Sequence, residues 1–451
     1  MKLTLPKESP LMAKEFLFGT ATAAFQIEGG ADEDGRRPSI WDTFCNSHGK
    51  IKDGSNGETA CNHYFLWKQD IDLVADLNFD AYRFSISWPR IIKDDRGTVN
   101  QKGLDFYRRI VDALRDRGMK PFATLYHWDL PQYWGNQGGW INRKAVDAFV
   151  EYADLISRTF GNDIEAYSTL NEPWCSAFLG YEHGVHAPGY KIRHMAFIVA
   201  HHLLLAHGLA MPVLKKNAPD ALCGIVLNFT PAYPHSQSSA DRLAADMSDG
   251  VSGHWFLQPL LEKSYPQSVM DAYTDAFPYD IHTDMETIGA PIDYLGVNYY
   301  TRSVVKSDDP EWESYYLPVA QPDAKKTAMG WEIYPEALTH LLTQLNRRYR
   351  LPPIYITENG AAFDDRLTDG RVDDAERIDY FRTHLDAVQR AMENGVDIRG
   401  YFAWSLMDNF EWAEGYTKRF GLVYVDYESQ ERIVKESGKA FRELLASRRP
   451  L

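Results

Sequence analysis

The sequence has fewer basic than acidic residues, and it lacks a long apolar run at its start. Lys and Arg total 48 against 63 Asp and Glu, which gives a formal net charge of −15. This balance argues against nucleic-acid and anionic-membrane partners, because neutralising phosphates requires clustered Lys and Arg. The opening MKLTLPKESPLMAKEF has no apolar stretch of signal-peptide length, and no later segment approaches the roughly 20 apolar residues of a membrane span. We therefore expect a soluble cytoplasmic protein without a membrane partner.

Several motifs that would indicate a metal or cofactor are also missing. The four cysteines form no CxxC pair and are expected to be free thiols; they are Cys45, Cys61, Cys175 and Cys223. His183 and His186 lie beside Glu182, but no HExxH occurs, and we expect no metal. No GxGxxG or GxxxxGK[ST] motif follows the first expected strand, which removes the main support for a dinucleotide or nucleotide site. The sequence predicts no cofactor.

What the sequence does have is a regular alternation of short apolar runs and long amphipathic segments. The expected strands are residues 17–25, 81–87, 121–126, 166–170, 223–227, 294–299, 354–357 and 399–404. Among the expected helices are residues 103–117, 143–160, 194–216, 335–350 and 375–394. The first helix places Leu104, Tyr107, Ile110, Val111 and Leu114 on one apolar face.

Eight strand–helix units without an intervening linker predict parallel strands joined by right-handed crossovers. Closed on themselves, the units form a single α/β domain over residues 1–451, a (β/α)8 TIM barrel. An open doubly wound sheet is the alternative. Residues 303–329, rich in Asp, Pro and Lys, are expected to form an extended βα loop. Residues 426–430, between apolar runs at 422–425 and 433–434, predict a small surface hairpin.

Polar and aromatic residues follow the expected strands directly, where a plain barrel would begin a solvated loop. Chemistry in such barrels lies at the carboxyl ends of the strands. The residues at these ends are Gln26, Arg83, His127, Trp128, Asn171, Glu172, Asn298, Tyr300, Glu358 and Trp404. We therefore expect these side chains to converge at one end of the barrel.

Two of these residues, Glu172 and Glu358, fit the two-carboxylate logic of glycoside cleavage. One carboxyl must arrive protonated to donate to the leaving oxygen, and the other must be ionised to meet the developing cationic centre. A shared cleft helps, since the charge of one raises the pKa of the other. Each Glu could instead be a helix cap or an ion-pair residue. Both lie beside an Asn after an apolar strand, which favours the catalytic interpretation.

Tryptophans supply a second signal, because the apolar face of a pyranose stacks on an indole. Those at or just beyond expected strand ends are Trp88, Trp128, Trp174, Trp331, Trp404 and Trp412. Core packing is the alternative for any single Trp. For the set at one face of a barrel, we expect sugar binding.

Taken together, these segments resemble glycoside hydrolase family 1, the β-glucosidase family, from residue 16 to about residue 434. The resemblance is carried by FLFGTATAAFQIEG, YRFSISWPRI, TLYHWDLP, TLNEP, GVNYY, YITENG, and AWSLMDNFEW with GYTKRFGLVYVDY. It implies a retaining β-glycosidase with a small-molecule β-glycoside as its partner. It also implies that the Trp404–Ser405 peptide bond is cis and that the two carboxyls lie about 5–5.5 Å apart.

The resemblance further implies residue roles. Glu172 would be the acid/base, and Glu358 the nucleophile of a covalent glycosyl-enzyme. Arg83 and Tyr300 would hold Glu358 ionised, with Asn298 supporting them. The implied substrate-binding positions are Gln26, His127, Trp128, Asn171, Asn298, Tyr300, Trp331, Trp404, Glu411, Trp412 and Phe420.

Two branches of this family differ from the chain in their site residues, and two further alternatives share its site. A phospho-glycosidase would carry Ser where this chain has Glu411, a carboxylate that would repel a phosphate, so we reject that branch. A thioglucosidase would lack the acid Glu172. A transglycosidase or a catalytically silent sugar-binding barrel could share the site, and the sequence leaves both open. It also leaves open the preference among glucose, galactose and fucose, the aglycone, and a homo-oligomeric state.

Overall fold

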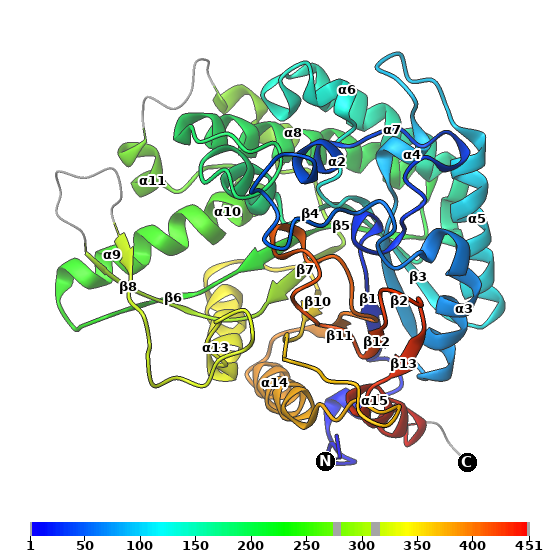
Figure 1. Ribbon diagram of the computed structural model, residues 1–451. Coiled ribbons are helices and arrows are strands. Elements are labelled where there is room, and N and C mark those ends of the chain that lie inside the picture. Colours follow the sequence, from blue (N-terminus) through cyan, green and yellow to red (C-terminus); the bar gives the residue numbers. More distant parts are fainter. Residues whose placement is uncertain (1, 274–280, 308–315, 449–451) are drawn as a thin grey trace.

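The computed structural model describes residues 2–273, 281–307 and 316–448. At its centre is a closed barrel of parallel strands in the order β1-β11-β10-β7-β5-β4-β3-β2 (Figure 1). These strands are β1 (Leu17–Ala21), β2 (Ala81–Ser85), β3 (Lys120–Tyr126), β4 (Ala166–Asn171), β5 (Leu222–Phe229), β7 (Tyr294–Tyr299), β10 (Ile354–Asn359) and β11 (Ile398–Trp404). Because β1 pairs with both β2 and β11, the predicted (β/α)8 barrel is confirmed and the open sheet is wrong.

A layer of helices surrounds the barrel, with one main helix following each strand (Figure 1). They are α3 (His63–Asp76), α5 (Gln101–Asp116), α7 (Lys144–Phe160), α8 (Arg193–Asn217), α10 (Trp255–Glu262), α13 (Pro335–Arg348), α14 (Ala375–Glu393) and α15 (Glu436–Ala446). The apolar stripe predicted for α5, from Leu104 to Leu114, is buried. Amphipathic periodicity therefore fixed which face of the helix meets the barrel.

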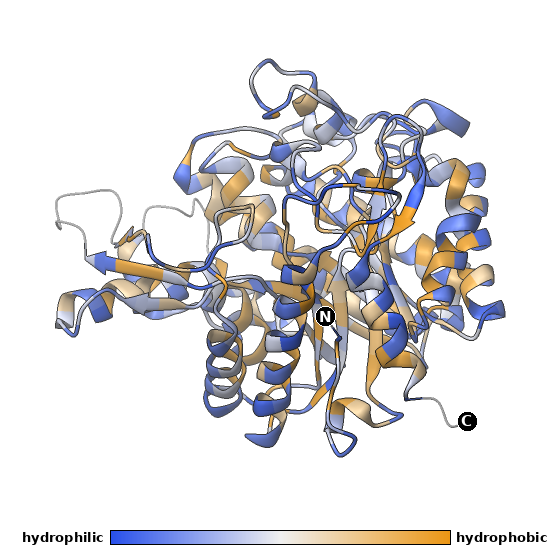
Figure 2. Cartoon of the chain, turned by 60° about the horizontal axis from the view of Figure 1, so that its bottom comes forward, coloured by the Kyte–Doolittle hydropathy of each residue, from blue (hydrophilic) through white to orange (hydrophobic). Residues whose placement is uncertain are grey.

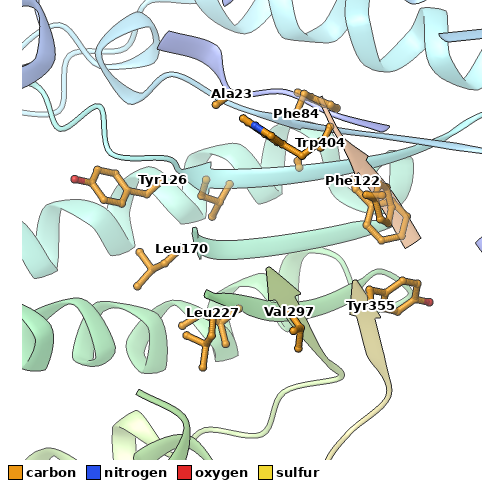
Figure 3. Packing of buried hydrophobic residues seen from close by; sticks show 14 of the residues in the cluster. Ala23, Phe84, Phe122, Tyr126, Leu170, Leu227, Val297, Tyr355 and Trp404 are labelled. Carbon is orange, nitrogen blue, oxygen red and sulfur yellow. The ribbon is translucent and has the colours of Figure 1, made fainter. Parts of the chain in front are cut away.

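The core fills the barrel and the space between strands and helices. The labelled side chains in Figure 3 come from every barrel strand except β1, with Ala23 just beyond it. Hydrophobic residues concentrate in the central strands and on the inner helix faces, with hydrophilic residues on outer turns and loops (Figure 2). Such strands, buried on both faces, are typical of parallel sheets.

Long loops at the carboxyl ends of the strands carry further elements. The predicted loop 303–329 contains β8 (Ser303–Ser307) and β9 (Tyr316–Pro318), which form a small sheet with β6 (Ala232–Pro234); its residues 308–315 lie outside the described residues. The predicted hairpin is confirmed, with β12 (Val423–Val425) antiparallel to β13 (Arg432–Val434). Shorter helices in the loops are α1 (Ala24–Ile27), α2 (Ile40–Cys45), α4 (Trp88–Ile91), α6 (Gln132–Gly135), α9 (Ser239–Asp249), α11 (Gln267–Ala272) and α12 (Met285–Ile288).

The first strand is shorter than predicted. β1 ends at Ala21, and Gln26 lies in α1 instead of at the end of an extended strand. The backbone N–H of Ala24 donates to Ser85 Oγ at 2.7 Å, which satisfies an N-terminal group of that short helix. Nothing near residue 22 breaks the apolar run, so the pattern alone gave no signal for the change.

Helix α8 is long and apolar enough to cross a membrane by length and composition, a property that the sequence analysis missed. Within the described residues, 83% of its most apolar window is buried. Core helices pass the same test, because a helix covered on most sides needs no polar face. α8 packs against α7, β4 and β5.

Burial on α13 provides a test of this packing. Leu342 is fully buried on the barrel side, whereas Gln344 on the same helix is exposed. Leu342→Ala should lower the free energy of unfolding by about 2–5 kcal/mol through a lost side chain and the cavity left behind. Gln344→Ala, the matched control, should stay within about 0.5 kcal/mol. Equal effects in denaturant unfolding would contradict this placement of α13.

Candidate active site

The predicted convergence of polar side chains is observed at the carboxyl ends of the strands. Arg83 in β2, Glu172 just beyond β4 and Glu358 in β10 are 1%, 6% and 3% exposed. Glu358 lies within its strand, since β10 extends two residues beyond the predicted end. Three charged groups that come from different parts of the chain are thus buried at one end of the barrel.

Glu358 receives a donor at each oxygen. Arg83 Nη1 donates to Oε1 at 2.7 Å, and Tyr300 Oη donates to Oε2 at 2.6 Å. The second guanidinium nitrogen of Arg83 donates to Asn171 Oδ1 at 2.6 Å. Both oxygens of Glu358 thus accept a hydrogen bond, one of them from a charged guanidinium, which makes this bond charge-assisted.

Glu172 has neutral partners. Asn298 Nδ2 donates to Oε1 at 2.7 Å, and the thiol of Cys175 donates to Oε2 at 3.1 Å. Burial, and after it the charge of Glu358, raises the pKa of Glu172 to about 7. The two carboxyls therefore have different partners, a guanidinium and a phenol at Glu358 and neutral amide and thiol donors at Glu172.

Asn298 has a different place from the expected one. It contacts Glu172, and its Nδ2 also donates to Asn171 Oδ1 at 3.1 Å. Its own Oδ1 accepts from Thr357 Oγ1 at 2.7 Å. None of these hydrogen bonds joins the Asn298 side chain to Arg83 or Tyr300, the two residues that it was expected to support. The amide instead connects the Glu172 and Asn171 side chains.

A second group of polar side chains surrounds Glu411. Gln26 Nε2 donates to Asn409 Oδ1 at 3.0 Å and to Phe410 O at 2.9 Å, and it lies 3.4 Å from Glu411 Oε2. Burial, followed by the charges of Glu358 and Glu172, raises the pKa of Glu411 to about 8. Within the described chain, Gln26 Oε1 and His127 Nδ1 are buried without a hydrogen-bond partner. Such orphaned atoms indicate a place for a polar ligand.

Aromatic rings surround these polar groups. The His127 ring stacks with Trp404 at 6.0 Å and with Trp412 at 5.8 Å between centroids. Trp128 lies 4.5 Å from Trp412 and donates from Nε1 to Asn171 O. Burial, and then the charge of Arg83, lowers the pKa of His127 well below its usual value, so the imidazole is neutral. The Trp404–Ser405 bond is cis, as the resemblance implied.

The other predicted aromatic residues divide into two groups. Trp331 and Phe420 both contact Tyr300, at 5.4 and 6.1 Å between centroids, and so lie on the Glu358 side of the site. The prediction for Trp88 is wrong, because its ring stacks on Tyr152 of α7 at 5.2 Å and is buried in the outer layer. Trp88 is the first residue of α4, beyond its strand, and its ring also contacts Phe149 of α7.

Trp174, which follows Glu172 by two residues in the sequence, lines a cavity of about 380 Å³. This cavity is bordered by Asn228 at the end of β5 and by Tyr316 of β9. Its walls mix aromatic rings with an amide, hydroxyl groups and the Arg193–Glu182 ion pair. That composition suits a second, hydroxylated part of a ligand.

The loop that carries Glu411 is fixed from the C-terminal part of the chain. Asp408 accepts from Arg419 Nη1 and from Lys435 Nζ, both at 2.6 Å, and all three groups are largely buried. Asn409 Oδ1 accepts a hydrogen bond from Gln26 Nε2. This contact, the bond from Thr357 to Asn298 and the bond from Cys175 to Glu172 were not predicted from the sequence. Only the position of Cys175, three residues after Glu172, gave a local signal; the Gln26 and Asn409 positions are 383 apart.

Of the two histidines considered as metal ligands, His183 is exposed, and the His186 ring packs against Trp41 and Trp128. Two buried histidines of α8 have other partners: His202 Nδ1 contacts Trp140 O, and His207 Nδ1 contacts Thr169 Oγ1, both at 2.7 Å. Among the described residues, no group of three or more His, Cys, Asp or Glu is arranged to hold a metal ion. All four cysteines are buried free thiols, as predicted.

The closed (β/α)8 barrel carries an ion-paired carboxyl group at Glu358, a carboxyl group of raised pKa at Glu172, and indole rings around them. This combination defines the site of a barrel glycoside hydrolase. The model of the family described as Glycosyl hydrolase family 1 matches residues 9–450, and the chain belongs to this family. The resemblance seen in the sequence is thus confirmed.

Similar proteins support this assignment over nearly the whole chain. The chain is 46% identical to Beta-glucosidase A of Thermotoga maritima over 425 residues, 94% of this chain and 95% of that protein. It is 46% identical to a bifunctional beta-D-glucosidase/beta-D-fucosidase of Bifidobacterium breve, covering 97% and 98%. The solved structure of a Thermotoga maritima beta-glucosidase with glucoimidazole matches with a TM-score of 0.95, 45% identity and coverage of 98% and 100%.

Gly360 tests the close contact that shapes the site. A Cβ at this position would lie 1.7 Å from the carbonyl oxygen of Trp404. Gly360→Ala should therefore displace the Trp404 backbone and destabilise the fold by about 3 kcal/mol, with an altered near-UV circular dichroism spectrum. Gly330→Ala is the control, because no atom lies within 4 Å and only its positive φ of 79° is strained. A Gly360→Ala cost no larger than that of the control would contradict the contact.

Proposed function

We propose that the chain is a retaining β-glucosidase, which removes terminal β-D-glucosyl residues by double displacement. The observation that carries the proposal is the unequal pair of carboxyls. Glu358 accepts from Arg83 and Tyr300, whereas buried Glu172 has a pKa raised to about 7. A nucleophile must be ionised and a general acid protonated at the same pH.

In the first step, a Glu358 oxygen forms a bond to the anomeric carbon while the bond to the glycosidic oxygen breaks. Glu172 gives its proton to that oxygen, and the aglycone leaves as an alcohol. In the second step, water attacks the anomeric carbon, its proton passes to Glu172, and the bond to Glu358 breaks. Two inversions give net retention. We expect the two carboxyls to lie about 5–5.5 Å apart, which a crystal structure would measure.

The surrounding residues would bind the glucosyl ring. Asn171, held between Arg83 and Asn298, would contact the 2-hydroxyl, where a hydrogen bond strengthens as charge develops. Gln26 Oε1 and His127 Nδ1 offer partners to other hydroxyls, since both are buried without one in the described chain. The remaining glycone contacts would come from Trp128, Asn298, Tyr300, Trp404, Glu411, Trp412 and Phe420.

The aglycone would extend past Trp331 and into the cavity beside Trp174. Its aromatic walls and hydroxyl groups suit further sugar units. We propose short cello-oligosaccharides as substrates, so that the enzyme acts late in cellulose degradation. Four unpaired thiols fit a reducing cytoplasm. A single barrel domain over residues 1–451, no nucleic-acid or membrane partner and a possible homo-oligomer complete the proposal.

The test is a panel of nitrophenyl β-glycosides and cello-oligosaccharides, with the product anomer followed by NMR. We expect the β-anomer of glucose to appear first, and a burst of phenol with an activated aryl glucoside. First release of the α-anomer would refute double displacement. Binding without any phenol release would favour a sugar-binding barrel.

Glu358→Ala should lower kcat by at least about 10⁴-fold, because the covalent intermediate can no longer form. Azide or formate should restore part of the turnover of an activated glucoside by entering the space of the missing carboxylate. The product should then have inverted configuration. A folded variant that these anions do not rescue would count against Glu358 as the nucleophile.

The pKa of Glu172 sets the expected pH dependence. Its acid form is present below about pH 7 and is lost as the pH rises, so kcat/KM for an unactivated glucoside should fall above that value. With a dinitrophenyl glucoside, which needs no proton, this limb should be absent, and Glu172→Gln should lose much less kcat/KM than with the unactivated glucoside. A wild-type plateau that extends to pH 9 would be inconsistent with this role of Glu172.

A further inference from the structure

The thiol of Cys175 lies directly against the carboxyl group that would transfer the proton. Its Sγ is 3.1 Å from Glu172 Oε2. Cys175 opens the π-helix η5 (Cys175–Leu179), and its backbone N–H also donates to the Glu172 carbonyl at 2.9 Å. The side chain is only 6% exposed. Backbone and side chain thus both fix the thiol beside Oε2.

The two partners of Glu172 differ in their chemistry. An amide N–H, such as Asn298 Nδ2 at Oε1, can only donate. A thiol carries a weak donor and a sulfur that accepts weakly, and it reverses its role by rotating about one bond. In the proposed reaction, Glu172 is a carboxylic acid before the first step and a carboxylate after it. Of these two neighbours, only the thiol can form a hydrogen bond with Glu172 in both states, by donating to the ionised Oε2 and by accepting from the protonated Oε2.

We infer that Cys175 is a positioning residue for Glu172, whose thiol donates to Oε2 of the carboxylate and turns to accept when Oε2 is protonated. It would hold the carboxyl in one orientation through both half-reactions. The inference rests on the proposed function, since it assigns a role within that reaction.

Cys175 is unsuited to be a nucleophile. Burial, and then the charge of Glu172, raises the pKa of its thiol well above the usual value. A thiol held in the S–H form is a poor nucleophile but keeps its proton to donate. The contact with Glu172 therefore acts through hydrogen bonding.

The protonation of Glu172 depends on several other groups. Those that interact electrostatically with it are Arg83 from β2, Glu358 from β10, Tyr300 beyond β7, and Glu411 beyond β11. Glu358 raises the pKa of Glu172, while Arg83 and the bonds from Asn298 and Cys175 lower it. Because a donated bond stabilises the carboxylate, its removal should raise the pKa further.

The experiment compares Cys175→Ala and Cys175→Val with Cys175→Ser in the full chain. In the Ala and Val variants, the alkaline limb of kcat/KM should move up by about 0.5 pH unit. With a phenyl β-glucoside, whose leaving group needs a proton, kcat/KM should fall about tenfold. With a 2,4-dinitrophenyl β-glucoside it should change less than about twofold, since this group leaves without protonation. The Ser variant, with a hydroxyl that donates and accepts, should recover most of both properties.

Cys223→Ala is the matched control. Cys223 is likewise a buried thiol, but it lies at the start of β5 and contacts Ala221 O. Its pH profile should match that of the wild type. All variants are assayed below the temperature at which any of them begins to unfold.

Two results would overturn the inference. One is an alkaline limb that is unchanged in the Ala and Val variants; the other is an equal loss for both leaving groups, which indicates general damage to the site. A wild-type protein that hydrolyses no glucoside would instead refute the proposed function. The two failures are thus distinguishable.

Discussion

The active-site arrangement depends on the guanidinium group of Arg83. It is buried and joins Glu358 to Asn171, so one side chain connects the proposed nucleophile with the proposed contact for the 2-hydroxyl. A carboxylate buried without such a partner becomes protonated or destabilises the fold. Glu172 and Glu411 have no guanidinium contact of this kind among the described hydrogen bonds, and burial raises the pKa of both. Among the described residues, the guanidinium of Arg83 therefore distinguishes Glu358 from the other two buried acidic groups.

Much of the fold could be predicted, because it is encoded in periodicity. Apolar runs placed all eight barrel strands, and the α5 stripe from Leu104 to Leu114 identified its inner face. Boundaries were less accurate. The change from β1 to α1 before Gln26 depends on a bond to Ser85, a residue about sixty positions away that no local pattern reveals. Residues 303–329 also contain two strands that pair with β6, and tertiary pairing of this kind leaves little trace in composition.

The site shows the same division. Position at a strand end correctly brought Arg83, Glu172 and Glu358 together, since the barrel forces those ends to converge. The prediction that Trp88 binds sugar was wrong, because a position near a strand end does not specify where the side chain packs, and Trp88 stacks on Tyr152 of α7. The partners of each group could not be predicted either. That Asn298 contacts Glu172, and that Asn409 contacts Gln26, follows from side-chain orientations fixed only in the packed structure.

The pairing of β1 with β11 has a consequence for how the protein is made. Thr20 and Ala403, which these strands bring together, are 383 positions apart. During synthesis, β1 leaves the ribosome long before its partner β11 exists, and the unfinished sheet keeps an unpaired edge until β11 has emerged. Unpaired strand edges promote aggregation. We therefore expect the nascent chain to benefit from chaperones that shield β1, and the site at the carboxyl ends of the strands to form only after β11 has emerged.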